Sequence, residues 1–400
     1  MTKTKKIAKT IACFLALMAL TFNSVLAADM IKVGVILPLS GKLAKFGEIE
    51  NKSYLMAVDE INTAGGVNGK KIELIIEDTS GKSNVGRAAI EKLIVRDKVI
   101  VIGGGCSSTV TWTAISIAQQ NKIPFLVNTG SADRITEQGW EYIFRLNPPV
   151  SEYPAAFKSF AQEVASDIKT VAILHVNSVF GVYEADKAIK QTEDLGFQII
   201  MKQSFEAGDS DFKPLLMNVK NKNPDLVYLI ANNLDASLLM RQCQELNLNP
   251  KLFVGNTTGF ALPAFQENTG NASEYVYSTA LWIPSAPYPD ARKYYDAFAD
   301  RYGIAADYHG AQAYAAMYVI ADALKRTKIL TSEEVRNALA KTDMMTVLGP
   351  VKFLSYDKKA QQNKLPVLLV QWINGELEIV WPEKIATRKY IYPTPKWAER

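Results

Sequence analysis

Two short segments of the chain gather hydroxyl side chains and glycine in a pattern that suits binding of a small anion. The first segment is 106–109, CSST, and the second is 128–131, NTGS; each directly follows an apolar, β-branched run or the glycines that end one. Ser and Thr at the start of a helix leave backbone N–H groups free, and such groups bind anions well. We therefore expect these two hydroxyl turns to form a neutral site for one carboxylate. The alternative is that they are only helix caps and turns.

The hydroxyl turns fall between predicted strands and helices of a parallel sheet. Strands are predicted at 31–37, 72–77, 99–102 and 123–127, and amphipathic helices at 47–62 and 84–97. Strands that alternate with helices indicate a doubly wound α/β unit. Ligands bind at the carboxyl ends of the strands in such units, which is where both turns would lie.

The same alternation repeats later in the chain, so two similar lobes are expected. The repeat is predicted to hold strands at 170–176, 197–203, 225–230 and 251–254, with helices at 152–165, 182–194, 211–221 and 234–246. Helices at 290–301, 309–326 and 332–341 and strands at 276–280, 351–354, 366–373 and 377–381 would complete the fold. A chain of 400 residues also exceeds what one core usually supports.

The first 27 residues have the pattern of a secretory signal peptide. Lysines lie in the segment 1–9, an apolar run follows at 11–20, and Val25-Leu26-Ala27 provides small residues for cleavage after Ala27. The apolar run is short for a membrane span, so an uncleaved anchor is the weaker interpretation. Without its four lysines the chain carries 41 basic and 41 acidic residues, which gives no indication of nucleic acid or an anionic membrane as partner.

The residues needed for common catalytic and metal sites are absent from the sequence. His175 and His309 are the only histidines, and neither has a second ligand at zinc spacing. No G-x-S-x-G motif of a serine hydrolase and no complete dinucleotide-binding motif occurs. The mature chain would keep only Cys106 and Cys243, too few for a disulfide framework. We therefore expect neither an enzyme, nor a metal ion, nor a cofactor.

Several segments resemble the type I periplasmic solute-binding proteins of ABC importers, in particular the leucine/isoleucine/valine-binding group. The resemblance covers essentially all of the mature chain and is carried by IKVGVILPLSGKLAKFGE at 31–48, AVDEINTAGGVNGKKIELIIEDT at 57–79, CSS at 106–108, KIPFLVNTGSA at 122–132, FGVYEA at 180–185 and WPEKIA at 381–386. It implies two Rossmann-like lobes joined by three hinge crossovers, near 147–150, 279–283 and 346–350. Lobe 1 would comprise 28–148 and 281–348, and lobe 2 would comprise 149–280 and 349–400.

The resemblance also implies roles for individual residues. Ser107 matches the serine that binds the ligand carboxylate, and Thr129 and Ser131 match the turn that contacts both ends of an amino acid; Ser108 and Gly130 belong to the same turns. The remaining candidates are two aromatic residues expected over the ligand and four polar residues at strand ends of lobe 2: Phe46, Phe180, Asn232, Asn233, Thr257 and Thr258.

One departure from the family pattern leaves the ligand open. Amino-acid binders are expected to carry an acidic residue near 254–259 for the ligand's α-ammonium group, and this segment, VGNTTG, has none. A buried ammonium group without a carboxylate would be costly. Either Asp235, the nearest acid, reaches the ligand, or the ligand carries no ammonium group.

The resemblance thus predicts a periplasmic, monomeric substrate-binding component of an ABC importer, with membrane permease and ATPase subunits as partners. Its ligand would be a small carboxylate: a branched-chain or other amino acid, or an amine-free aromatic or aliphatic acid. The alternatives are a ligand-sensing module of a receptor, or a binder of a short amide or urea-type ligand.

Overall fold

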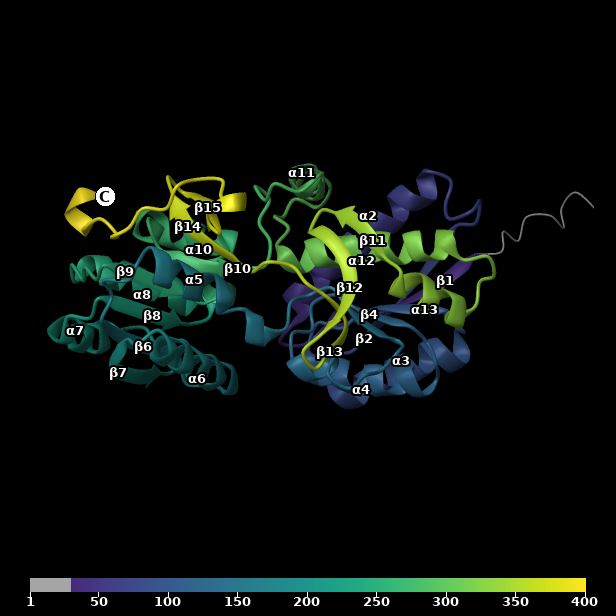
Figure 1. Ribbon diagram of the computed structural model, residues 1–400, viewed down its shortest axis with the longest axis horizontal. Coiled ribbons are helices and arrows are strands. Elements are labelled where there is room, and N and C mark those ends of the chain that lie inside the picture. Colours follow the sequence, from purple (N-terminus) through teal and green to yellow (C-terminus); the bar gives the residue numbers. More distant parts are fainter. Residues whose placement is uncertain (1–29) are drawn as a thin grey trace, which may run out of the picture.

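The protein consists of two α/β lobes that lie side by side (Figure 1). The computed structural model describes residues 30–400, without the side chains of Val179, Phe180 and Asn233. The predicted signal peptide and its cleavage after Ala27 lie outside the described residues. Within residues 30–400, no helix combines the length and the apolar composition needed to cross a membrane.

The first lobe is built on an eight-stranded sheet. Its strands, in spatial order, are β11 (Asp343–Thr346), β12 (Gly349–Tyr356), β13 (Lys359–Asn363), β5 (Ile143–Arg145), β4 (Phe125–Val127), β3 (Val101–Gly104), β1 (Ile31–Leu37) and β2 (Ile72–Asp78). Neighbouring strands from β13 to β2 are parallel, and β12 and β11 join in antiparallel orientation. The central strands read as continuous apolar runs because both faces of the sheet are covered.

Helices cover both faces of this sheet. One face carries α2 (Ala44–Thr63), α11 (Ala291–Tyr302), α12 (Tyr308–Arg326) and α13 (Ser332–Ala340). The other carries α3 (Ser83–Glu91), which continues as a π-helical turn at Lys92–Arg96, and α4 (Ser108–Gln120). The alanines along α12 let it lie close to α2 and the sheet, with nearly the whole helix buried. This close packing fixes the start of α12 beside the hydroxyl turns.

The second lobe repeats the plan with seven strands. Their spatial order is β15 (Glu376–Trp381), β14 (Leu368–Ile373), β10 (Tyr277–Ala280), β9 (Leu252–Gly255), β8 (Leu226–Ile230), β6 (Thr170–Val176) and β7 (Gln198–Phe205). Helices α5 (Ala155–Glu163) and α6 (Val179–Asp194) pack on one face. Helices α7 (Lys213–Lys222), α8 (Asn233–Glu245) and α10 (Pro263–Thr269) pack on the other, and the short α9 (Thr257–Phe260) follows β9.

The chain crosses between the lobes three times, and the third crossing differs from the prediction. The first two lie between β5 and α5 and between β10 and α11. The third lies between β13 and β14, at 364–367, rather than near 346–350. The prediction that 349–400 belongs to lobe 2 is therefore wrong for β12 and β13. Gln362 of β13 pairs with Arg145 of β5, and its side chain accepts a hydrogen bond of 2.5 Å from the Arg145 guanidinium, which holds this hairpin in the first sheet.

A close backbone approach sets the position of the first hydroxyl turn. Gly104, the last residue of β3, has a φ of +109°, and a Cβ atom there would lie 2.3 Å from the carbonyl oxygen of Ile36. Only glycine allows this contact. This contact brings the end of β3 against β1. The following residues, 105–108, therefore form the first hydroxyl turn above the edge of the sheet.

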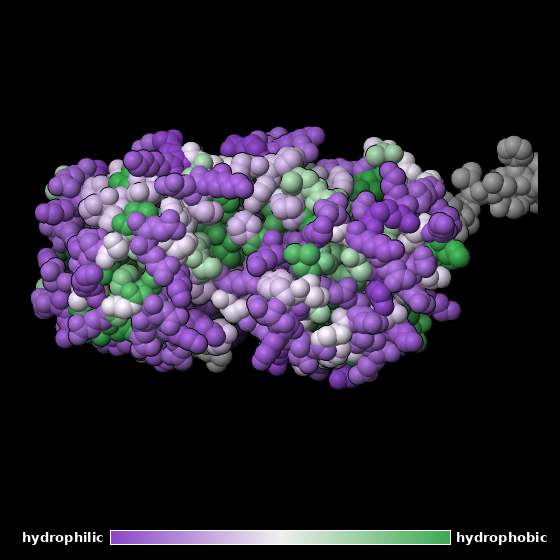
Figure 2. Space-filling view, in the orientation of Figure 1, coloured by the Kyte–Doolittle hydropathy of each residue, from purple (hydrophilic) through white to green (hydrophobic). Residues whose placement is uncertain are grey.

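The surface in the view of Figure 2 is hydrophilic over most of both lobes, with scattered apolar patches that include the region where the lobes meet. Among residues 30–400, no group of three or more His, Cys, Asp or Glu side chains is arranged to hold a metal ion.

Candidate functional site

The two hydroxyl turns contact each other at the carboxyl edge of the first sheet. Ser108 begins α4, and its Oγ accepts hydrogen bonds of 3.2 Å from the backbone N–H groups of both Ser131 and Ala132. Ser107 occupies the N-cap position with extended backbone, and its side chain makes no cap hydrogen bond. The hydroxyl of Ser107 and the first N–H groups of α4 thus remain available to a ligand.

A buried carboxylate lies beneath both turns and joins them. Glu50 of α2 accepts hydrogen bonds from Asn128 Nδ2 at 2.9 Å and from Thr129 Oγ1 at 2.8 Å, and the thiol of Cys106 bonds to it as well. Burial raises the pKa of Glu50, against the opposing effects of the His309 charge and these hydrogen bonds. Neither turn can move without disturbing this network. The spacing of apolar and charged residues in the α2 segment does not indicate that the Glu50 side chain points into the lobe.

A second buried acid holds a histidine at the start of α12. The Asp307 carboxylate accepts a hydrogen bond from the His309 backbone and lies 3.2 Å from His309 Nδ1. Burial alone would lower the pKa of His309. The negative charges of Asp307 and Glu50 and the hydrogen bond to Asp307 have a larger opposite effect, so the pKa of His309 is raised. Its ring stacks between Phe46, at 4.4 Å, and Tyr308, at 4.0 Å. Phe46, which we expected over the ligand, therefore packs on this imidazole and is half-buried.

The second lobe contains a small polar pocket beside α6. We call it the Glu184 pocket; its cavity measures about 20 Å³, and its lining includes Tyr153, Glu184, Tyr228, Asn256, Thr257 and Thr279. Thr257, one of the predicted site residues, starts α9 and pairs with Thr279 through their hydroxyls at 2.8 Å. Glu184 lies on α6 within the FGVYEA segment, and the sequence reasoning missed it.

Tyr153 connects the two halves of the site. Its hydroxyl accepts a hydrogen bond of 3.0 Å from Asn147 Nδ2 and also bonds to the side chain of Ser131. Burial raises the pKa of Tyr153 to about 12, and the nearby Glu184 carboxylate acts in the same direction. One tyrosine thus touches the second hydroxyl turn and lines the Glu184 pocket.

A roomier cavity adjoins the Glu184 pocket where the lobes meet. This junction pocket measures about 170 Å³ and shares Thr257 with the Glu184 pocket. Lobe 1 contributes Arg292, Tyr295, Asp307 and Tyr308, and lobe 2 contributes side chains from the α9–α10 region and the β14–β15 hairpin. Tyr308 packs against the apolar cores of both lobes. The site therefore offers polar walls beside a space for an apolar or aromatic body.

The remaining predicted site residues differ in exposure and in their contacts. Asn232 is exposed at the start of α8, and the Thr258 hydroxyl accepts a 2.7 Å hydrogen bond from Asn256. Gly130 is packed within the second hydroxyl turn, with the Gly105 carbonyl oxygen 2.9 Å from where its Cβ would be. The side chains of Phe180 and Asn233 are not described.

The suggestion that Asp235 reaches the ligand is wrong. Its carboxylate is buried and accepts a 3.0 Å hydrogen bond from the backbone of Gly208, in the turn after β7. It lines neither the Glu184 pocket nor the junction pocket. Asp235 fastens a turn of lobe 2 instead of facing the cleft.

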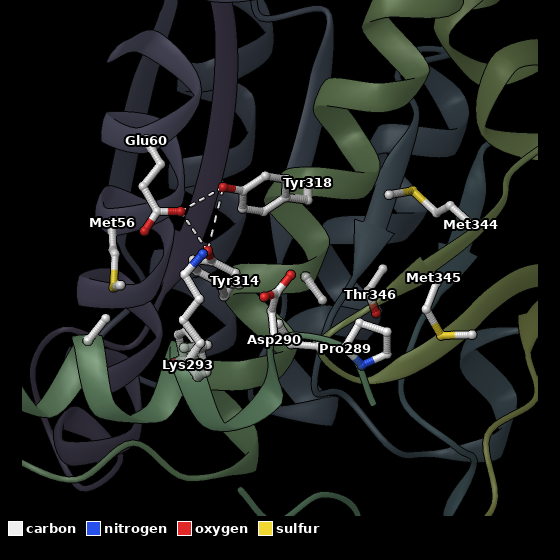
Figure 3. Close-up of a pocket in the computed structure, with 14 residues that line it drawn as sticks. Met56, Glu60, Pro289, Asp290, Lys293, Tyr314, Tyr318, Met344, Met345 and Thr346 are labelled. Carbon is white, nitrogen blue, oxygen red and sulfur yellow. Dashed lines mark hydrogen bonds between the residues drawn. The ribbon is translucent and has the colours of Figure 1, made fainter. Parts of the chain in front are cut away.

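Another pocket, of about 290 Å³, lies within lobe 1 alone (Figure 3). It is formed by α2, α11, α12 and β11, and includes Met56, Met344 and Met345. Its half-buried polar side chains bond to one another: Glu60 accepts hydrogen bonds of 2.6 Å from both Tyr314 and Tyr318. Since lobe 2 contributes nothing to this pocket, a ligand there would not bridge the lobes.

Comparisons with known proteins agree with this two-lobe geometry. The family model described as "Periplasmic binding protein" matches residues 30–376. The chain is 28% identical over 354 residues to the leucine-, isoleucine-, valine-, threonine- and alanine-binding protein of Pseudomonas aeruginosa, covering 87% of this chain and 91% of that protein.

Solved structures show the same fold. The branched-chain amino acid transporter substrate-binding protein of Streptococcus pneumoniae, in complex with isoleucine, superposes with a TM-score of 0.73 at 23% identity, covering 91% of this chain and 100% of that one. The solute-binding protein of an ABC transporter of R. palustris, in complex with benzoate, has a TM-score of 0.72 at 18% identity, covering 92% and 97%.

Proposed function

Since the chain belongs to the periplasmic binding protein family, we propose that it is the substrate-binding component of an ABC importer and captures a small carboxylate between its lobes. The observation that carries the proposal is the pair of joined hydroxyl turns at the carboxyl edge of the first sheet, in which the Ser107 side chain makes no cap hydrogen bond. The relatives support the same class, because leucine, isoleucine and benzoate all carry a carboxylate.

The ligand's carboxylate would bind at the hydroxyl turns without a positively charged side chain. Neutral hydroxyl and N–H donors, together with the positive end of a helix, stabilise one negative charge at a helix start. Ser107 supplies a free hydroxyl, and α4 supplies its unpaired N–H groups. Glu50 holds the turns in place from beneath. We propose Ser107, Ser108, Thr129, Gly130 and Ser131 as the lobe 1 half of the binding site.

Lobe 2 would complete the site from the opposite side of the cleft. Thr257 lines both the junction pocket and the Glu184 pocket, and Tyr153 links the second hydroxyl turn of lobe 1 to the Glu184 pocket. A ligand that contacts both lobes favours the closed arrangement because it gains contacts there that the open arrangement lacks. The closed protein, a monomer in the periplasm, would then deliver the ligand to permease and ATPase subunits.

A thermal-shift screen tests this proposal. The panel contains leucine, isoleucine, benzoate, 4-methylpentanoate and short aliphatic amides. A ligand at a hundred times its Kd stabilises the folded state by about 2.7 kcal/mol, which gives a clear rise in Tm. We expect at least one carboxylate to produce it. A response to the amides alone, or no response to any carboxylate together with ester or amide hydrolysis, would contradict the proposal.

A further inference from the structure

A fully buried arginine lies beside the second hydroxyl turn. Arg145 is the last residue of β5, and no part of it is exposed to solvent. Its guanidinium donates hydrogen bonds to three oxygens, listed with their distances: Gln362 Oε1 at 2.5 Å, the Ala132 carbonyl at 2.7 Å and Thr136 Oγ1 at 2.9 Å. All three acceptors are neutral. The hydrogen bonds of the guanidinium are therefore made, but no contact balances its positive charge.

The carboxylates that act on Arg145 do so from a distance and are bonded elsewhere. Asp133 and Glu152 attract the guanidinium through space, and neither forms an ion pair with it in the part of the chain that the structure describes. Asp133 accepts a 3.2 Å hydrogen bond from the Ser151 backbone, and Glu152 accepts one of 2.7 Å from the Tyr356 hydroxyl. Both acids are only half-buried, so water weakens the effect of their charges.

Arg145 stays charged at neutral pH in spite of its burial. Burial lowers the pKa of Arg145 to about 10, against smaller opposing effects of nearby tyrosine and carboxylate groups. A buried charge without a counter-ion is unfavourable, because the protein interior solvates it less well than water does. An anion that binds close to Arg145 would reduce this cost.

Two hydrogen-bonded paths connect Arg145 to the hydroxyl turns. In the first, Ala132 accepts from Arg145 through its carbonyl and donates through its N–H to Ser108 Oγ at 3.2 Å. In the second, Gln362 accepts from Arg145 and donates at 2.9 Å to the carbonyl of Asn147. The side-chain amide of that asparagine donates at 3.0 Å to a backbone carbonyl of the second hydroxyl turn. The guanidinium is thus one or two residues away from the groups proposed to hold the ligand's carboxylate.

We propose that Arg145 supplies the positive charge that makes the neutral hydroxyl turns select an anion. The inference rests on the proposed function, since it takes these turns as the carboxylate site. The turns form the hydrogen bonds to the ligand, and Arg145 acts on it from behind as a positioning residue, without touching it. A carboxylate bound there balances the buried charge, whereas an amide or urea-type ligand of the same shape does not.

Two substitutions at Thr136 separate the charge of Arg145 from the shape of its surroundings. The Thr136 hydroxyl is buried, accepts from Arg145 and donates at 3.1 Å to Gln362. Thr136→Asp places a carboxylate beside the guanidinium, and Thr136→Asn places a neutral group of the same size there. The aspartate variant should have at least as high a Tm without ligand, because it gives Arg145 a counter-ion. A lower Tm, or failure of the aspartate variant alone to fold, would overturn the proposal.

Isothermal titration then measures the effect on binding. The probe is whichever of leucine, isoleucine, benzoate and 4-methylpentanoate gives the wild-type protein its largest thermal shift. Because the new carboxylate neutralises Arg145, Thr136→Asp should have a Kd for the probe at least about fivefold higher than that of Thr136→Asn. A merely structural role of Arg145 predicts equal Kd values for the two variants, and that result would overturn the proposal.

Arg145→Lys and Arg145→Met provide a second, independent pair. The lysine keeps the positive charge and the methionine removes it, while both lose the three-way hydrogen bonding of the guanidinium. Arg145→Lys should bind the probe at least about fivefold more tightly than Arg145→Met. Equal affinities would overturn the inference and leave the proposed function standing, and if one pair does not fold, the other decides. Failure of the wild-type protein to bind any of the four carboxylates would overturn the proposed function and this inference with it.

Discussion

The hydroxyl of Thr129 donates a 2.8 Å hydrogen bond to the carboxylate of Glu50, a residue 79 positions earlier in the chain. Both side chains are buried, Glu50 completely. The contact joins the middle of α2 to the turn after β4, and Asn128 strengthens it with a second hydrogen bond. The shape of the proposed carboxylate site thus depends on a residue that does not itself face the cleft.

Loss of the Thr129 hydroxyl should therefore destabilise lobe 1. Thr129→Val leaves the buried Glu50 carboxylate short of one donor, at a cost of about 1–3 kcal/mol in the free energy of unfolding. Urea denaturation measures this change. The control is Thr113→Val on α4, where the hydroxyl bonds only to the helix backbone at 3.4 Å, and a change within about 0.5 kcal/mol is expected. Equal effects of the two substitutions would contradict the role given to Glu50.

The pair of His309 and Asp307 should make stability depend on pH. The raised pKa of His309 means that the folded protein holds this proton more tightly than the unfolded chain does. Its stabilising contribution is complete below the unfolded value of 6.5 and is lost as pH rises through the raised pKa. Each unit of pKa difference corresponds to about 1.4 kcal/mol.

This expectation is tested by urea denaturation of the wild type and of His309→Gln at a series of pH values from 5.5 to 9. The series runs from roughly one unit below to over two units above the pKa of an unfolded histidine. The stability advantage of the wild type should shrink as pH rises. His175→Gln serves as the control, because the His175 ring bonds to the backbone carbonyl of Val176 rather than to a carboxylate. An advantage that stays constant or grows with pH would count against the His309–Asp307 pair.

Gly104 should tolerate no side chain. Gly104→Ala adds a Cβ atom 2.3 Å from the Ile36 carbonyl oxygen, at a φ of +109°. Gly65→Ala is the matched control: its φ is +104°, and no atom lies within 4 Å of the added Cβ. The control should cost about 1 kcal/mol from backbone strain alone, and Gly104→Ala should cost clearly more. Similar unfolding free energies for the two variants would show that the close approach of β3 to β1 is not required.

Much of the architecture could be predicted from the sequence because the spacing of apolar residues in the α/β units agrees with the burial of those residues. The strands Ile31–Leu37 and Thr170–Val176 were predicted with the bounds that the structure has. The hairpin of β12 and β13 was assigned to the wrong lobe. Its strands carry few apolar residues, and their place is set by the contact of Gln362 with Arg145, which lies 217 positions away in the sequence.

The candidate site, like the fold, could be predicted only in part from the sequence. The contact between the two hydroxyl turns follows from sheet topology, and the structure has it through Ser108. Glu184 and Glu50 could not be identified, because an acid on an amphipathic helix gives no sign of whether it faces solvent or the cleft. Asp235 was the nearest acid in sequence to the expected position, but its side chain turns to Gly208 instead.

The central claim is that one carboxylate ligand contacts both lobes at once, and titration of one substitution on each side tests it most directly. Isothermal titration would compare the wild type, Ser107→Ala and Thr257→Val with the carboxylate that gives the largest thermal shift. We predict one ligand per chain and a loss of about 1–3 kcal/mol of binding free energy in each variant, the cost of an unpaired buried polar group. Wild-type affinity in either variant would show that its lobe does not contribute to the site, and the account of a ligand held between the lobes would then be wrong.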